Sequence, residues 1–398
     1  MSDLAQRRAV VLVIDACGAG ALPDAGDYGD EGANTLAHLA EATGGLELPV
    51  LAQLGLGSIL ELRGVPAAAD PAIHGRLAPL GPGKDSITGH WELMGVSLPA
   101  PAPTYPDGFP AGLVDRLERA MARKVICNRP DNGLAAIEEF GAEHLRSGAL
   151  ILYTSQDSVL QLAAHVDRVP PGELYEACAA ARAVMSGPDA VGRVIARPFS
   201  GQPGAFVRTA GRRDLALAPP SRSYLEELED AGVEVMAVGK VDDLFASRGV
   251  TSAHPGASNA QALASVERLL GERRPGLIFA NLIETDQLYG HRKDTAGFHH
   301  ALRLIDAALG RILAALGPGD VLIVTADHGV DPAHAGTDHT REYVPLLASS
   351  GEMERARAEG AQRDGRRHDG PMADVGATAL AWLAGARAEG LPGRSFIS

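Results

Sequence analysis

An apolar run that passes directly into an Asp-His pair places the strongest constraint on the fold of this 398-residue chain. Residues 321–326 read Val-Leu-Ile-Val-Thr-Ala, which is rich in β-branched side chains and lacks clean alternation, as in a strand covered on both faces. Asp327 and His328 follow at once and therefore stand where this strand ends. In open α/β sheets, ligands bind at the edge formed by the carboxyl ends of the strands. The run thus predicts a sheet between helices with a polar site at that edge.

Two further apolar runs end in the same way. Residues 9–14 lead into Asp15, and residues 276–283 lead into Asp286, with His291 five positions later. A single carboxylate after a strand is usually a turn or a cap, and a single histidine is usually a surface or core residue. Here they coincide at three strand ends, and six N/O donors suit two ions that share a bridging oxygen. We therefore predict a two-metal site built from Asp15, Asp286, His291, Asp327, His328 and His339.

The donor types narrow the choice of ion. Carboxylate and imidazole without thiolate favour Mn2+, Zn2+ or Fe, whereas Ca2+ prefers oxygen throughout. We predict two Mn2+ ions, with Zn2+ or Mg2+ as alternatives. Asp331, His334 and Asp338 lie in the same loop as the last two ligands, and we expect them to orient ligands rather than to bind the metal themselves.

A hydroxyl-bearing segment offers a group for the metals to activate. Residues 81–92 carry Lys84, Ser86 and Thr88 among glycines, with no helical or strand period, which predicts an irregular loop that could begin a helix. A serine hydroxyl next to a metal loses its proton more readily and becomes a nucleophile. The alternative is a serine that caps a helix. These residues alone leave both interpretations open.

Five segments together resemble the phosphopentomutases of the alkaline phosphatase superfamily, and they are Lys84-Asp-Ser-Ile-Thr-Gly-His-Trp-Glu92, Tyr153-Thr-Ser-Gln-Asp-Ser158, Gly192-Arg-Val-Ile-Ala-Arg-Pro-Phe199, Gly290-His-Arg292 and the stretch from Asp327 to Tyr343. The resemblance implies an isomerase that interconverts α-D-ribose 1-phosphate and D-ribose 5-phosphate, and the 2-deoxyribose pair. It also implies a phosphoserine enzyme and a pentose 1,5-bisphosphate intermediate. The alternatives are a metal-dependent phosphatase, another phosphosugar or phosphoglycerate mutase, and a non-catalytic sugar-phosphate-binding protein.

The resemblance also implies roles for individual residues. One manganese would be held by Asp15, Asp327, His328 and the nucleophile, and the other by Asp286, His291 and His339. Phosphopentomutases typically have threonine at the nucleophile position, where this chain has Ser86. We expect Ser86 rather than Thr88 to be the nucleophile, because position in the loop sets the distance to the metals.

Substrate contacts are implied in the same way. Ser155 and Asp157 would bind the sugar, and Arg193, Arg208 and Lys240 would hold the phosphate distal to the metals. A sugar bisphosphate such as glucose 1,6-bisphosphate would serve as activator.

Proline-rich stretches divide the chain. Residues 98–110 and 217–221 cannot continue a helix or an inner strand, and they bracket a segment with its own strand and helix signals. We predict a metal-binding catalytic core from residues 1–99 and 219–398, and an inserted α+β cap domain, residues 100–218, that binds substrate. Alternating helix and strand signals in the core predict an α/β fold with a doubly wound, mostly parallel sheet of the alkaline phosphatase type.

Composition limits the partners. The net charge of −14 argues against nonspecific binding to nucleic acid or membrane. Three scattered cysteines predict no disulfide framework, and no apolar stretch approaches the length of a membrane span. We therefore expect a cytoplasmic enzyme whose partner is a small phosphosugar, and the sequence gives no oligomeric state.

Overall fold

The computed structural model describes residues 3–155 and 158–397. The chain divides into two compact units, a larger one of residues 1–100 and 219–398 and a smaller one of residues 101–218. Within the described part, no helix is both long and apolar enough to cross a membrane.

The larger unit is built on an eight-stranded sheet with the order β10-β9-β11-β1-β12-β13-β2-β14. Strands β10, β9, β11, β1 and β12 run parallel to one another, and β13 is antiparallel to both of its neighbours. The strands are β1 (Arg8–Ile14), β2 (Ile73–Ala78), β9 (Val235–Val238), β10 (Ser252–His254), β11 (Gly276–Leu282), β12 (Asp320–Thr325), β13 (Val344–Ser350) and β14 (Gly370–Pro371).

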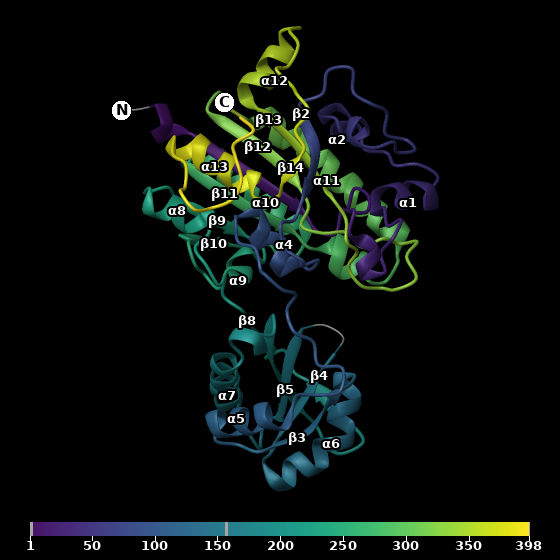
Figure 1. Ribbon diagram of the computed structural model, residues 1–398, viewed down its shortest axis with the longest axis vertical. Coiled ribbons are helices and arrows are strands. Elements are labelled where there is room, and N and C mark those ends of the chain that lie inside the picture. Colours follow the sequence, from purple (N-terminus) through teal and green to yellow (C-terminus); the bar gives the residue numbers. More distant parts are fainter. Residues whose placement is uncertain (1–2, 156–157, 398) are drawn as a thin grey trace. The chain divides into compact units, whose positions relative to one another are not determined.

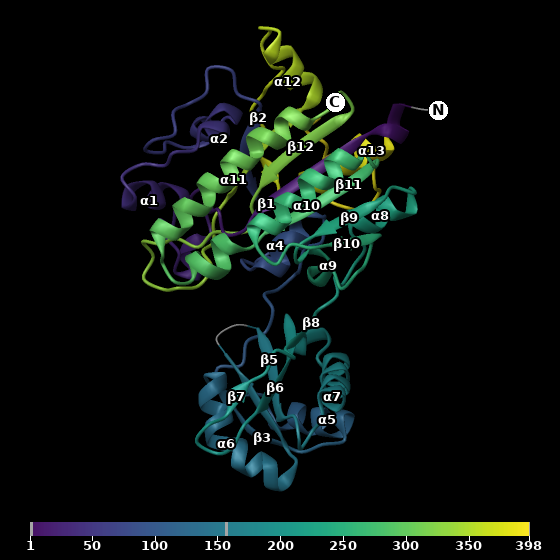
Figure 2. The ribbon, with the colours of Figure 1, turned by 180° about the vertical axis from the view of Figure 1, so that it is seen from behind.

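Helices cover both faces of this sheet. Figure 1 shows α13 and α4 on the near face, and the reverse view in Figure 2 shows α10 and α11 on the other. The prediction of an α/β fold with a mostly parallel, doubly wound sheet is confirmed. The helices are α1 (Thr35–Ala42), α2 (Pro49–Leu54), α3 (Leu56–Ile59), α4 (Ser86–Leu93), α8 (Tyr224–Asp230), α9 (Val241–Leu244), α10 (Asn259–Glu272), α11 (Thr295–Ala315), α12 (Gly351–Ala358) and α13 (Asp374–Ala384).

Burial explains why the central strands are mostly apolar. Every residue of β1, β11 and β12 is buried, because helices lie on both faces and further strands on both sides. Buried polar residues in these strands are paired: the guanidinium of Arg8 forms an ion pair with Asp320 across β1 and β12 and also donates to the carbonyl of Leu270. A buried charge of this kind is tolerated only when it is paired and hydrogen-bonded.

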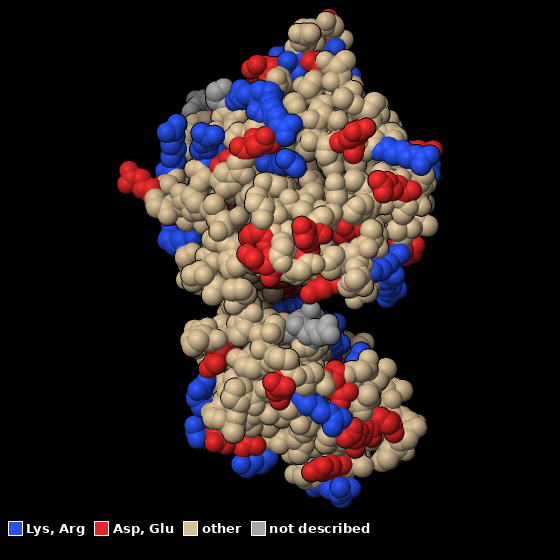
Figure 3. Space-filling model, turned by 45° about the vertical axis from the view of Figure 1, so that its right-hand side comes forward, with Lys and Arg blue, Asp and Glu red and all other residues tan. Residues whose placement is uncertain are grey.

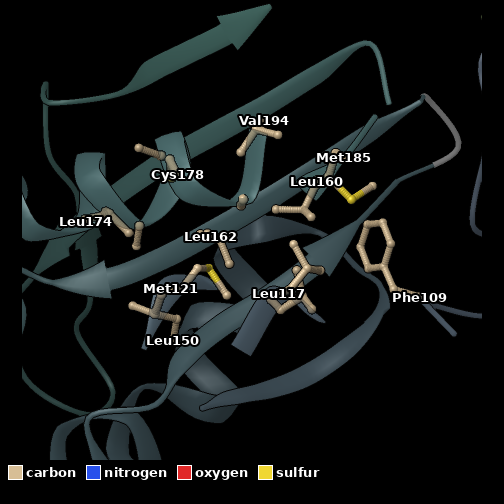
Figure 4. Close-up of a cluster of buried hydrophobic side chains, with 14 of the residues drawn as sticks. Phe109, Leu117, Met121, Leu150, Leu160, Leu162, Leu174, Cys178, Met185 and Val194 are labelled. Carbon is tan, nitrogen blue, oxygen red and sulfur yellow. The ribbon is translucent and has the colours of Figure 1, made fainter. Parts of the chain in front are cut away.

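The smaller unit has a mixed sheet with the order β3-β4-β5-β6-β7, and β8 also pairs with β6. Its helices are α5 (Ala111–Met121), α6 (Gly133–Ser147) and α7 (Pro171–Val184). Figure 4 shows the core on one face of the sheet, where Leu117 and Met121 of α5 and Leu174 and Cys178 of α7 pack with strand residues. The strands are β3 (Val125–Pro130), β4 (Leu150–Thr154), β5 (Val159–His165), β6 (Arg193–Ser200), β7 (Val207–Arg208) and β8 (Arg213–Ala216).

Candidate metal centre

Sheet order brings the three predicted aspartates together. Strands β11, β1 and β12 are adjacent and parallel, so their carboxyl ends meet at one edge. Asp15 follows β1, Asp327 lies two residues beyond β12, and Asp286 lies four residues beyond β11. The turn after β1 is sharp, because Ala16 adopts a φ of 67°, which non-glycine residues rarely adopt. This turn directs the Ala16 N–H to Asp327 Oδ1 at 3.2 Å.

The first group of donors is completely buried. His328 Nε2 lies 3.2 Å from Asp15 Oδ1 and 3.5 Å from Asp327 Oδ2. One donor atom from each of these three residues lies within 4.8 Å of the other two. They could therefore bind a single ion.

The second group forms around Asp286. Asp286 Oδ1 lies 3.3 Å from His291 Nε2 and 3.6 Å from His339 Nε2. The spacing of five residues between Asp286 and His291 follows from a π-helical turn, Thr285–Gly290, in which the His291 N–H donates to the Asp286 carbonyl. Donor atoms of Asp286, His328 and His339 also lie within 4.8 Å of one another, so His328 lies close to both groups and not only to the first.

Several buried atoms in this cluster have no hydrogen bond in the described structure, and they are Asp286 Oδ1, Asp327 Oδ2 and His339 Nε2. The imidazoles near them are close in distance but badly aligned; His90 Nδ1, for example, lies 3.2 Å from Asp327 Oδ2 but pairs with the Ser86 carbonyl at 2.8 Å. Buried polar atoms are normally paired, and leaving one unpaired costs about 1–3 kcal/mol. Unpaired carboxylate and imidazole atoms that converge in this way fit divalent metal ions.

The electrostatics support the same interpretation. Burial alone would raise the pKa of Asp327, but the adjacent His328 and His90 outweigh it and lower that pKa to about 2. Burial and the charge of Asp327 raise the pKa of Asp15. The neighbouring carboxylate of Asp286 raises the pKa of His291 to about 9. The positive charge of protonated imidazoles thus compensates the negative charge of the carboxylates. A bound metal ion would displace those protons and supply the positive charge instead.

Ser86 lies at the edge of the first donor group. It is the first residue of α4, and its Oγ is 3.0 Å from His328 Nε2 and 3.4 Å from Asp15 Oδ1. Thr88 is engaged elsewhere, because its hydroxyl donates to Asp85 Oδ2 at 2.8 Å within a capping box at the start of α4. The segment is therefore a loop that begins a helix, with Asp85 as the capping residue and Ser86 facing the cluster.

Sequence reasoning missed two residues behind the cluster. The Asn281 amide Nδ2 donates to Asp15 Oδ2 at 3.0 Å and lies 3.1 Å from His90 Nε2. His90 is fully buried one turn after Ser86. The spacing of four residues on α4 was a signal for His90, whereas the role of Asn281 depends on the pairing of β11 with β1.

The loop residues expected to orient ligands divide into two kinds. Asp338 Oδ1 accepts the backbone N–H of His339 at 2.8 Å, so it contacts a predicted ligand directly. Asp331 instead pairs with His38 and accepts the Asn34 N–H, and His334 Nε2 contacts the Gly29 carbonyl. These last two bind the loop to the N-terminal segment.

The predicted substrate residues lie in both units. Lys240 precedes α9 in the larger unit, where its Nζ donates to Gln287 Oε1 at 3.2 Å. In the smaller unit Ser155 follows β4, and Asp157 lies outside the described residues. Arg193 begins β6 opposite Val159, and Arg208 on β7 pairs with Phe199. Along β6, Arg193 and Phe199, the residue that pairs with Arg208, are six positions apart. At 3.3 Å per residue this corresponds to about 20 Å.

Comparisons with known proteins identify the family to which the chain belongs. The model of the Metalloenzyme superfamily matches residues 7–385. A phosphopentomutase from Symbiobacterium thermophilum is 51% identical over 346 residues, which cover 86% of this chain and 88% of that protein. One from Anaeromyxobacter sp. is 48% identical and covers 98% of both chains. The PH0037 protein from Pyrococcus horikoshii has a similar fold, with a TM-score of 0.50 at 15% identity over 96% of this chain and 99% of that one. The extent and identity of these matches confirm the resemblance seen in the sequence: the chain belongs to the phosphopentomutase family of the metalloenzyme superfamily.

Proposed function

We propose that this chain interconverts α-D-ribose 1-phosphate and D-ribose 5-phosphate, and the 2-deoxyribose pair, in the cytoplasm. Family membership supports the reaction, and one observation supports the route. The Ser86 hydroxyl lies 3.0 Å from His328 Nε2 at the first turn of α4, where a transferred phosphoryl group would meet both the metal cluster and a helix N-terminus.

The metal ligands are proposed as two sets. Asp15, Asp327 and His328, with Ser86, would hold one ion, and Asp286, His291 and His339 would hold the other. Mn2+ is the proposed ion, with Zn2+ or Mg2+ as alternatives. When bound, the two ions would stabilise negative charge on the phosphoryl group and on the oxygens that exchange it.

The transfer conserves phosphate. Phospho-Ser86 gives its phosphoryl group to the free hydroxyl of the pentose phosphate: the Oγ–P bond breaks, a sugar O–P bond forms, and the hydroxyl proton passes to Oγ. The product is a pentose 1,5-bisphosphate. Once this intermediate has turned end for end, its other phosphoryl group moves to Ser86 and leaves the isomer.

The smaller unit is proposed as the cap that holds the sugar. Ser155 and Asp157 would bind the sugar hydroxyls, and Arg193, Arg208 and Lys240 would bind the phosphate distal to the metals. Such a cap keeps water from the phosphoserine while the intermediate reorients. A bisphosphate such as glucose 1,6-bisphosphate would restore phosphoserine that has been lost.

A product assay tests the reaction. The protein is incubated with ribose 5-phosphate, Mn2+ and a trace of glucose 1,6-bisphosphate, and the products are separated. We expect ribose 1-phosphate with little free phosphate. Free phosphate as the main product would identify a phosphatase, and binding without either product would identify a sugar-phosphate-binding protein.

A further inference from the structure

Residues 81–83 form the loop that precedes the nucleophile, and side chains from other segments bind all three of their carbonyl groups. Arg341 Nη1 donates to the carbonyls of Gly81 and Gly83, each at 2.9 Å. The Tyr28 hydroxyl donates to the carbonyl between them, that of Pro82, at 3.0 Å. A loop without regular secondary structure usually leaves such groups to water. Here the protein itself fixes them.

The Arg341 side chain is itself held firmly. It is 5% exposed, and its Nε and Nη2 both bond to the carboxylate of Asp24. Its guanidinium lies 5.0 Å from the ring centre of Tyr28. The backbone N–H of Arg341 donates to Asp30 Oδ2, the atom that also accepts from Lys84 Nζ at 2.8 Å. The planar fork of arginine can bridge a carboxylate and two carbonyls at once, which the single ammonium of lysine cannot.

The opposite side of the loop is bound to α4. Glu92 Oε2 and Oε1 accept the N–H groups of Leu80 and Gly81 at 2.8 and 2.7 Å. A Cβ on Gly83 would lie 2.2 Å from Thr88 Oγ1, so the loop packs directly on the first turn of the helix. The loop is therefore held between Arg341 on its carbonyl side and the helix that begins with Ser86.

Arg341 also follows His339 by two residues, so one short segment carries both a proposed metal ligand and the contact to the loop. We propose that Arg341 is a positioning residue: by fixing residues 81–83 it sets the place of the Ser86 hydroxyl relative to the metal cluster. This inference rests on the proposed role of Ser86 as nucleophile. Displacing a reacting group by about 1 Å can cost about 100-fold in rate, so a fixed loop has a direct catalytic consequence.

Two variants and one control test the proposal. Arg341→Ala removes the guanidinium, and Arg341→Lys keeps the charge but loses the fork. Arg363→Ala is the matched control, because Arg363 has a side chain only 1% exposed and bonds two carbonyls, those of Gln53 and Asp70, and the carboxylate of Glu354. All three substitutions should lower the midpoint of thermal unfolding. A difference between the Arg341 variants and Arg363→Ala in the two measurements below therefore cannot come from lost stability alone.

The first measurement does not depend on the reaction. Hydrogen–deuterium exchange of the full-length protein should show residues 79–86 exchanging roughly tenfold faster or more in Arg341→Ala, and at the wild-type rate in Arg363→Ala. Unchanged exchange of this segment in Arg341→Ala would overturn the proposal, even if the protein proves not to be a mutase.

The second measurement follows phosphorylation of Ser86 by saturating glucose 1,6-bisphosphate. We expect both Arg341 variants to slow it by roughly 10- to 100-fold with metal content unchanged, and added guanidinium ion to restore part of the rate in Arg341→Ala. Arg363→Ala should retain the wild-type rate. Wild-type rates in both Arg341 variants would overturn the proposal, whereas absence of phosphoserine in the wild-type protein would instead contradict the proposed function.

Discussion

At the residue scale, the site is recognised by what its atoms lack. Asp286 Oδ1, Asp327 Oδ2 and His339 Nε2 are buried without hydrogen bonds, although other buried carboxylates in the described chain are well paired. Glu342, for example, accepts bonds from Thr35 and Thr340. The contrast indicates that the free-energy cost of burying these atoms without hydrogen bonds is offset by metal binding rather than by folding.

This leads to a prediction for one ligand. Asp286→Asn keeps the volume of the side chain but removes its charge, so we expect metal content to fall from two ions per chain to one and turnover to be lost. Asp306→Asn is the control, because Asp306 is also buried but accepts the N–H groups of Val50 and Leu51 in the first turn of α2. Metal analysis after dialysis measures both. Two ions retained in Asp286→Asn would refute its role as a ligand.

Sequence reasoning reached the residues of the donor cluster because each follows an apolar strand or recurs at a short spacing. It could not reach Asn281 or His90, since their contacts with Asp15 and Asp327 arise from strand register and helix packing. It also could not reveal that His328 lies close to both donor groups.

At the element scale, strand ends and helix starts do most of the positioning. The predicted parallel strands are present within one or two residues of their expected bounds. The antiparallel pairing of β13 with β2 and β12 was not predicted, because residues 344–350 carry a proline and no alternation that would mark a strand direction. The π-helical turn was not predicted either, although the five-residue spacing of Asp286 and His291 reflects it.

An element of the smaller unit gives a pH prediction. His144 on α6 is fully buried; its Nδ1 pairs with the Ala149 carbonyl at 2.7 Å, and its Nε2 accepts the His165 N–H at 2.8 Å. Burial lowers the pKa of His144 below its usual value of about 6.5, because this ring is built in as the neutral form. The unfolded state therefore binds more protons, so the stability of the smaller unit should be constant above about pH 6.5 and fall as the pH is lowered through the folded-state pKa.

Two probes separate this unit from the other. Both tryptophans, Trp91 and Trp382, belong to the larger unit, so circular dichroism reports on both units and tryptophan fluorescence on one. As the pH is lowered, we expect the unfolding transition seen by dichroism to shift before the one seen by fluorescence. The variant His144→Asn should be less stable at pH 7.5, but its stability should depend less on pH between pH 7 and 5. An equally steep dependence in the variant would exclude His144 as its source.

At the scale of the whole molecule, charge is distributed unevenly. In Figure 3 the acidic side chains of the larger unit gather toward the lower part of its visible face, and a group of basic side chains lies toward the upper left. A chain with a net charge of −14 must concentrate its cations to bind phosphate esters. The proposed substrate arginines belong to the smaller unit, and every proposed metal ligand belongs to the larger one. The central feature of the proposed mutase is thus that one unit binds the metals and the other binds the distal phosphate.

The proposed role of the smaller unit can be tested by how well the enzyme retains the bisphosphate intermediate. Losing one charge-assisted contact to phosphate costs about 1.5–3 kcal/mol, or roughly 10- to 100-fold in retention. Arg193→Ala and Arg208→Ala should therefore raise the dependence on added glucose 1,6-bisphosphate and the ratio of free phosphate to isomerised product, with both ions still bound. Arg213→Ala is the control, since this exposed arginine stacks on Tyr175. Unchanged activator dependence in both variants would remove these arginines from the substrate site.

The most direct test of the account is the identity of the phosphorylated residue. After incubation with glucose 1,6-bisphosphate and Mn2+, intact-mass analysis should show one added phosphoryl group in the wild-type protein and in Thr88→Ala, and none in Ser86→Ala. The Ser86 hydroxyl faces His328 and Asp15, whereas that of Thr88 is bonded to Asp85. A phosphoryl group that persists in Ser86→Ala and disappears in Thr88→Ala would contradict the account.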